Sequence, residues 1–137
     1  MIERLFGNTR VAEKALDGSW LRNEAITQNI ANVDTPGYKR KTVSFEQILG
    51  DAIDDSSFKG FRTDERHIPI GGTDVDKVNI EVGQDNSSLS MRLDGNNVDM
   101  DNEMALMAKN NIMYNTLTQR LTAEFKKLKS VISEGRR

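Results

Sequence analysis

A proline–glycine turn at residues 35–38 constrains the fold of this chain more than any other feature of its sequence. Thr35-Pro-Gly-Tyr38 places proline at the second turn position and glycine at the third. Pro36 fixes its own φ, and Gly37 readily adopts the positive φ that a type II turn requires. Because proline also disfavours helical backbone at the residue before it, a helix that approaches this turn is predicted to end near Val33.

Short polar side chains precede the proline. Asn32 is predicted to adopt a left-handed conformation at the end of the helix, and the side chains of Asn29 and Asp34 can bond local backbone groups. On local chemistry alone, these residues describe a helix stop and contain no catalytic constellation.

The residues before the turn, 1–33, have the heptad pattern of an amphipathic helix, with steps of four and three. Ser19 and Asn23 interrupt the apolar series, and Gly18 lowers the stability of a helix by about 1 kcal/mol relative to alanine. Such a helix is marginal alone and is predicted to need a partner helix. The series comprises Leu5, Thr9, Ala12, Leu16, Ser19, Asn23, Ile26, Ile30 and Val33.

Residues 99–133 carry the strongest helix pattern in the chain. Asp99 is the predicted N-cap, and Asp101 and Glu103 in the first turn offset the helix macrodipole. The helix would be about 50 Å long at 1.5 Å per residue. Its apolar series comprises Met100, Met104, Met107, Asn111, Tyr114, Leu117, Leu121, Phe125, Leu128 and Ile132.

Two long helices with apolar stripes, at opposite ends of a short chain, predict an antiparallel, coiled-coil-like hairpin and a mainly α fold. Residues 1–33 and 99–137 would form one helical unit, and residues 34–98 a separate central segment. The residues that we expect to pack between helices or between subunits are Leu16, Ile26, Ile30, Met104, Met107, Tyr114, Leu117, Leu121, Phe125 and Leu128.

The central segment is less regular. Its basic triplet at 39–41 is predicted to be a solvated loop. A short helix is predicted near 45–53, with Phe45, Ile48 and Leu49 on its buried side. Alternating patterns at 68–70 and 78–82 predict short strands, so the segment is expected to be a small, exposed, β-containing unit.

Composition excludes several classes of function. The net charge of −2 gives no strong field for nucleic acid or membrane binding, and the chain has no cysteine for disulfides or thiolate chemistry. His67 is the single histidine, so we expect neither a metal site nor a cofactor. We also expect no enzymatic activity, because no nucleophile–base set or phosphate loop is present. The N-terminus lacks the apolar core of a secretory signal, and no run reaches transmembrane length.

Two blocks carry a resemblance to a known family. The stretch from Asn29 to Lys39, Asn-Ile-Ala-Asn-Val-Asp-Thr-Pro-Gly-Tyr-Lys, resembles the N-terminal signature of the rod and hook family of bacterial flagellar axial proteins. Leu93 to Met104, Leu-Asp-Gly-Asn-Asn-Val-Asp-Met-Asp-Asn-Glu-Met, resembles the start of the C-terminal helix in its proximal rod members. Together with their flanking helices, the blocks cover roughly half of the chain. The positions that match are Asn29, Asn32, Asp34, Thr35, Pro36, Gly37 and Tyr38, followed by Asn97, Asp99 and Glu103.

The resemblance implies a structural subunit of the flagellar basal-body rod. Such subunits assemble through their terminal helices into a tube that transmits motor torque and encloses the export channel. The implied partners are other copies of the chain, other rod proteins, and the adaptor and export-gate proteins at the rod base. The implied location lies outside the cytoplasmic membrane, reached through the flagellar export apparatus without a cleaved signal peptide. Two alternatives stay open: a coiled-coil adaptor outside the flagellum, and a neighbouring proximal rod protein of the same family.

Overall fold

A computed structural model of the chain describes residues 2–57, 79–85 and 93–135. In chain order, the elements are α1 (Ile2–Ala31), β1 (Lys41–Val43), α2 (Glu46–Ser57), β2 (Val82–Gln84) and α3 (Met100–Glu134). The sequence predicted both long helices to within a few residues of these ends, and the mainly helical fold is confirmed.

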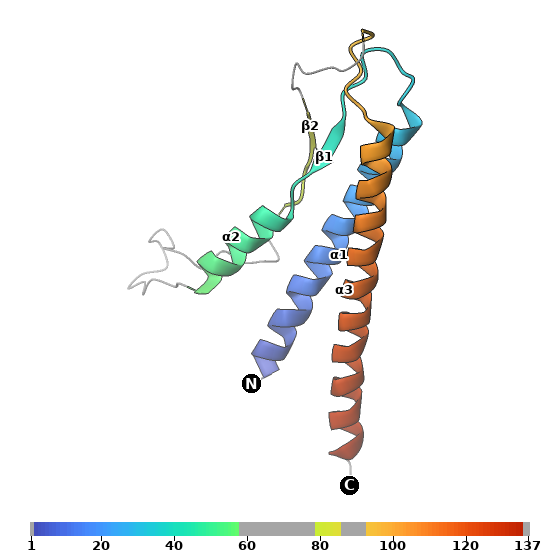
Figure 1. Ribbon diagram of the computed structural model, residues 1–137. Coiled ribbons are helices and arrows are strands. Elements are labelled where there is room, and N and C mark those ends of the chain that lie inside the picture. The colour runs from blue at the N-terminus through green and yellow to red at the C-terminus, as the bar shows by residue number, and fades with distance from the viewer. Residues whose placement is uncertain (1, 58–78, 86–92, 136–137) are drawn as a thin grey trace, which may run out of the picture.

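Helices α1 and α3 lie side by side and antiparallel, so that both chain termini are at the same end of the molecule (Figure 1). The predicted hairpin is therefore present. Helix α3 extends beyond the N-terminus of α1, whereas the polypeptide between the two helices turns back at the opposite end (Figure 1). The β strands and α2 branch from that end and lie beside α1.

The contact between the two helices is built from small and polar side chains. On the α1 side Ser19 is fully buried, although the sequence pattern treats it as an interruption. On the α3 side, the buried Asn110 donates a hydrogen bond of 2.8 Å from Nδ2 to the backbone oxygen of Ser19. Small residues let the helix backbones approach closely. Ala15, Gly18 and Ala25 are also buried, but they pack towards the core around Phe45. The other buried residues of α1 with described side chains are Thr9, Ala12, Ser19, Ile26 and Asn29.

The face of α3 that meets α1 is displaced by one residue from the predicted apolar series over the first half of the helix. Glu103 and Asn110 are buried, whereas Met104 and Tyr114 are exposed. Because one residue corresponds to about 100° around a helix of 3.6 residues per turn, the predicted series lies beside the helix–helix seam. The two series share Leu117, which packs against the buried core.

The two strands form a small antiparallel sheet that attaches to α1. Lys41 of β1 pairs with Gln84 of β2, and Val43 pairs with Val82. The prediction of a solvated loop at 39–41 is wrong, because this segment continues into β1 and its side chains are half-buried. The strand predicted at 78–82 begins only at Val82, and the one predicted at 68–70 falls outside the described residues.

The small core sits where α1, β1 and α2 meet. Phe45 is 1% exposed and packs where α1 carries Gly18, since a Cβ at that glycine would lie 2.4 Å from Cγ of Phe45. Leu49 and Val43 belong to the same cluster. The predicted burial of Phe45 and Leu49 is confirmed, whereas Ile48 is exposed.

Candidate functional site: a polar junction and an exposed helix face

A network of polar side chains ties the end of α1 to β1 and to the start of α3. We call this network the polar junction. It lies at the end of the helix pair away from both termini (Figure 1). Most of its members come from the two blocks of the family resemblance, and the other two directly follow the first block. The members from the blocks are Asn29, Tyr38, Asn96, Asn97 and Glu103, and the two that follow are Arg40 and Lys41.

Asn29 is the centre of the polar junction and is completely buried. Its Oδ1 accepts a hydrogen bond of 2.8 Å from the backbone N–H of Lys41, and its Nδ2 donates one of 2.8 Å to the backbone oxygen of the same residue. The side-chain amide therefore pairs with β1 as a neighbouring strand would. Nδ2 also donates to Glu103 at 3.1 Å, which joins α1, β1 and α3 through one side chain.

Tyr38 adds a further bond to this amide. Its hydroxyl donates to Oδ1 of Asn29 at 3.3 Å. Burial, and secondarily the nearby carboxylate of Glu103, raises the pKa of Tyr38 above its ordinary value. The phenol is therefore held in its neutral, donating form.

Glu103 is a fully buried carboxylate in the first turn of α3. Its Oε1 accepts from Nε of Arg40 at 2.5 Å, and its Oε2 accepts from Asn29. A buried charge is tolerated only when it is paired and hydrogen-bonded, and both conditions are met here. The sequence predicted a macrodipole role for Glu103, and its burial was missed because its partner Arg40 was placed in a solvated loop.

Asn96 satisfies the carbonyl groups that are left over where α1 ends. Its Nδ2 lies 3.0, 2.8 and 3.0 Å from the backbone oxygens of Asn32, Val33 and Thr35. Its Oδ1 accepts from the N–H of Val98 at 2.8 Å. These carbonyl groups belong to residues that directly follow α1, so Asn96 fixes the turn after α1 to the segment that precedes α3.

The residues around Asn96 complete this connection. Asn97 accepts from the backbone N–H of Arg40 at 2.7 Å and donates to the backbone oxygen of Asp85 at 2.9 Å. Asp99 is the N-cap of α3, as predicted, and accepts from the N–H groups of Asp101 and Asn102.

The turn at 35–38 has the predicted geometry. Gly37 has a φ of 70°, and the N–H of Tyr38 donates to the oxygen of Thr35 at 3.3 Å. The N–H of Gly37 bonds to Asp94, which fixes the turn against the second block. The left-handed cap predicted at Asn32 is wrong, because no described residue other than glycine has a positive φ. Asp34 and Pro36 are exposed.

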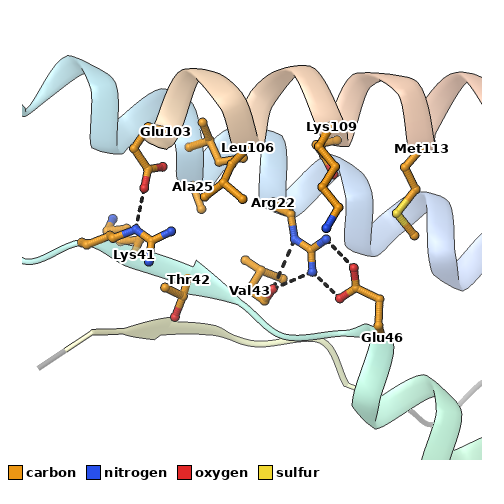
Figure 2. A pocket seen from close by; sticks show the side chains of 13 residues that line it. Arg22, Ala25, Lys41, Thr42, Val43, Glu46, Glu103, Leu106, Lys109 and Met113 are labelled. Atoms are coloured by element: carbon orange, nitrogen blue, oxygen red, sulfur yellow. Dashed lines mark hydrogen bonds and ion pairs between the residues drawn. The ribbon is translucent and has the colours of Figure 1, made fainter. Parts of the chain in front are cut away.

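A second anchor holds α2 against α1. Arg22 donates to the backbone oxygen of Val43 and forms a bidentate ion pair with Glu46 (Figure 2). Its guanidinium also lies 4.6 Å from the ring centre of Phe45. The hydrogen bonds from Arg22 are the main cause of a lowered pKa at Glu46, and Lys109 contributes through its charge.

The two anchors border an open groove between β1, α1 and α3. It has a volume of about 280 Å³. In Figure 2, Lys109 and Met113 of α3 point towards the groove from one side, and Val43 and Glu46 border it on the other. Its remaining lining residues are Arg22, Ala25, Ile26, Arg40, Lys41, Thr42, Glu103, Leu106 and Asn110.

Helix α3 also carries large apolar side chains that the chain itself leaves uncovered. We call these residues the outer stripe: Met100, Met104, Tyr114, Phe125 and Ile132. Each belongs to the apolar series predicted from the sequence, and the exposed fractions of Met104 and Phe125 are 52% and 51%.

The remaining residues predicted to pack are buried or half-buried. Ile26 is buried, and the half-buried members are Leu16, Ile30, Met107, Leu117, Leu121 and Leu128. The chain therefore covers one side of the predicted series, whereas Met104, Tyr114 and Phe125 require another molecule if they are to be buried.

The described residues contain the polar junction, the Arg22–Glu46 ion pair, the groove and the outer stripe. Within them, no group of three or more metal-ligating side chains comes together, and His67 lies outside the described ranges. No helix in the described part of the chain is both long and apolar enough to cross a membrane.

Comparisons with known proteins place this sequence beside flagellar rod proteins. A family model described as "Flagella basal body rod protein" matches residues 10–39, which include most of α1 and the turn. The flagellar basal body rod protein FlgB of Bacillus subtilis is 37% identical over 95% of this chain and 96% of its own length. The FlgB proteins of Yersinia enterocolitica and Escherichia coli are 32% and 29% identical, each over 98% of this chain.

Proposed function

Because this chain belongs to the FlgB family of flagellar basal body rod proteins, it is a structural component of the rod, and we propose that its helix pair forms the rod wall. We also propose that the chain has two units: α1 and α3 form the axial unit, and residues 34–98 form the central unit. Assembly with other rod components follows from membership of the family.

The observation that carries the proposal is the outer stripe. In this chain α3 packs on α1 through one face and presents Met104, Tyr114 and Phe125 on the next. At about 100° per residue, these side chains share one face of α3, and an exposed apolar surface marks a site of protein–protein contact. Contacts between two different surfaces of identical subunits generate open helical assemblies when the rotation does not close. The outer stripe is thus suited to packing between subunits.

The finer partners follow from the location of a rod. We propose that the subunit contacts the adaptor and export-gate proteins at the rod base, in addition to other rod proteins. It would reach this place outside the cytoplasmic membrane through the flagellar export apparatus, with no cleaved signal peptide. We also propose that the chain has no catalytic role, because the polar junction joins its charges to one another and presents no reacting group.

The relatives favour the proximal rod over the alternatives. Similarity to FlgB proteins extends along almost the whole chain, so it includes the central segment. A helical adaptor outside the flagellum would have no reason to share the sequence of that segment. These relatives are all named FlgB, which favours FlgB over FlgC, the neighbouring proximal rod protein.

The test is a change in the outer stripe that leaves the subunit folded. The double variant Tyr114→Ser, Phe125→Ser removes two large exposed side chains, so the isolated protein should keep its helical circular dichroism. We expect the variant not to restore swimming to a strain that lacks the gene. Gln119→Ser is the matched control, because Gln119 is exposed on α3 away from the outer stripe. Normal swimming of the double variant would contradict the proposal.

A further inference from the structure

The groove beside α3 and the residues at the start of α3 complement each other in charge. Four cationic residues line the groove, Arg22, Arg40, Lys41 and Lys109, against two carboxylates. Both carboxylates are already paired, Glu46 with Arg22 and Glu103 with Arg40. The groove therefore presents an excess of positive charge above an apolar wall.

Lys109 is the cation best placed to meet a partner. It is exposed, and within the described residues it makes no hydrogen bond or ion pair, although its charge acts on Glu46. Met113 lies one helical turn further along the same side of α3, and both side chains point towards the groove in Figure 2. A ligand for this site would combine a carboxylate with an apolar group about one helical turn away.

The start of α3 has this combination on another face of the helix. Asp101 is exposed, and Met104 follows it three residues later with about half of its surface uncovered. At about 100° per residue, Met104 lies opposite Met113 around the helix axis, and Asp101 lies about 80° from Lys109. The acidic, methionine-bearing face and the cationic groove are thus two different surfaces of one helix.

We propose that Asp101 and Met104 of one subunit enter the groove of a second copy of this chain, against Lys109 and Met113. The inference rests on the proposed role in the rod wall and names one of its lateral contacts. A single shift along the helix axis satisfies both pairs, since Asp101 and Lys109 are eight residues apart and Met104 and Met113 are nine. At 1.5 Å per residue, this shift is about 12 to 14 Å.

The two surfaces differ, so the contact is heterologous and leaves a groove open on one subunit and a helix start open on the other. Repetition of the contact adds subunits side by side, each displaced along the axis. This is the arrangement that a helical wall requires. Methionine suits such a contact because its flexible side chain adapts to an irregular pocket.

Engineered disulfides in assembled basal bodies test the contact directly, because the chain has no cysteine of its own. We expect the double variant Met104→Cys, Met113→Cys to give covalent dimers and larger multimers after mild oxidation of isolated basal bodies. The matched control is Met104→Cys, Ile112→Cys, because Ile112 is adjacent in sequence but exposed outside the groove. Disulfides form only where Cα atoms lie within about 7 Å, so the control should stay monomeric.

Monomers alone from the Met104, Met113 variant, in cells that still swim, would overturn this contact and leave the rod function intact. Should that variant prevent rod assembly, exchange of the charges decides the matter. We expect Lys109→Glu and Asp101→Lys each to reduce the number of swimming cells at least tenfold, and the combined variant to restore it. Equal loss in the combined variant would contradict the proposal.

Discussion

Among single residues, Asn29 shows most clearly how a side chain can take the place of a neighbouring strand's backbone. Its side-chain amide hydrogen-bonds to both the backbone N–H and the backbone C=O of Lys41, and it also donates to the carboxylate of Glu103. Neither aspartate nor glutamine reproduces this arrangement, since one lacks the donor and the other is longer by a methylene group. The family signature therefore marks a residue that connects three elements.

Replacing Asn29 by alanine should be strongly destabilising. The variant leaves the N–H and C=O of Lys41 and one oxygen of Glu103 without a partner in a buried site, and we expect a loss of about 2 to 4 kcal/mol in the free energy of unfolding. Urea denaturation followed by circular dichroism measures it. Thr27→Ala, on the exposed side of the same helix, should change the value by less than about 0.5 kcal/mol. Similar effects at the two positions would show that Asn29 is only a helix surface residue.

Two glycines in helices should respond in opposite directions to the same substitution. At Gly18 an alanine Cβ would collide with the ring of Phe45, whereas at Gly50 it would meet nothing within 4 Å. We expect Gly18→Ala to destabilise by about 1 to 3 kcal/mol through overpacking, and Gly50→Ala to stabilise by about 0.5 to 1 kcal/mol through helix propensity. Thermal unfolding of both variants checks the pair, and stabilisation by both would refute the tight contact at Gly18.

At the scale of elements, the sequence was sufficient to predict the two long helices, but it did not predict β1. The ends of α1 and α3 follow from strong local signals, the proline turn and the Asp99 cap. The face that α3 turns towards α1 does not follow from a local signal. Glu103 and Asn110 are buried there, whereas the apolar series predicts Met104 and Tyr114 at that face. Burial of a charge depends on a partner that is distant in sequence, and Arg40 is 63 residues away from Glu103.

The strand β1 was missed for a related reason. A triplet of basic residues at 39–41 indicates a solvated loop when each charge is considered alone. In the folded chain, Lys39 donates to the backbone oxygen of Gly95, Arg40 pairs with Glu103, and Lys41 donates to Gln28. Each acceptor lies at least 13 residues away in sequence, so the local sequence carries no signal for these contacts.

The attachment of α2 to α1 should depend on pH in the acid range. Arg22 lowers the pKa of Glu46 in the folded protein from the ordinary value of 4.5. The ion pair therefore adds stability above pH 4.5 and loses it as the pH falls through the lowered folded value. Because Glu46 is half-exposed, the contribution is at most about 1 kcal/mol. Glu46→Gln should flatten this part of the stability profile, and an unchanged profile between pH 5 and about pH 3 would exclude the contribution.

At the scale of the whole molecule, the chain is anchored at one end and sparsely packed at the other. The polar junction holds the closed end of the helix pair, and the Phe45 cluster packs beside the middle of α1. Towards its C-terminus, α3 extends beyond α1 (Figure 1) and carries Phe125, Val131 and Ile132 with large exposed surfaces. This distribution suits a subunit that completes its packing only against its neighbours.

Amide hydrogen exchange, compared between the isolated subunit and the assembled rod, shows whether α3 completes its packing only against neighbouring subunits. In the isolated subunit, we expect slow exchange in the bonded amides around residues 29–43 and 96–110, and fast exchange in residues 118–134. On assembly, residues 118–134 should become protected, because neighbouring subunits cover the outer stripe. Strong protection of residues 118–134 in the isolated subunit, with no gain on assembly, would mean that the helix pair is complete by itself and would contradict the account.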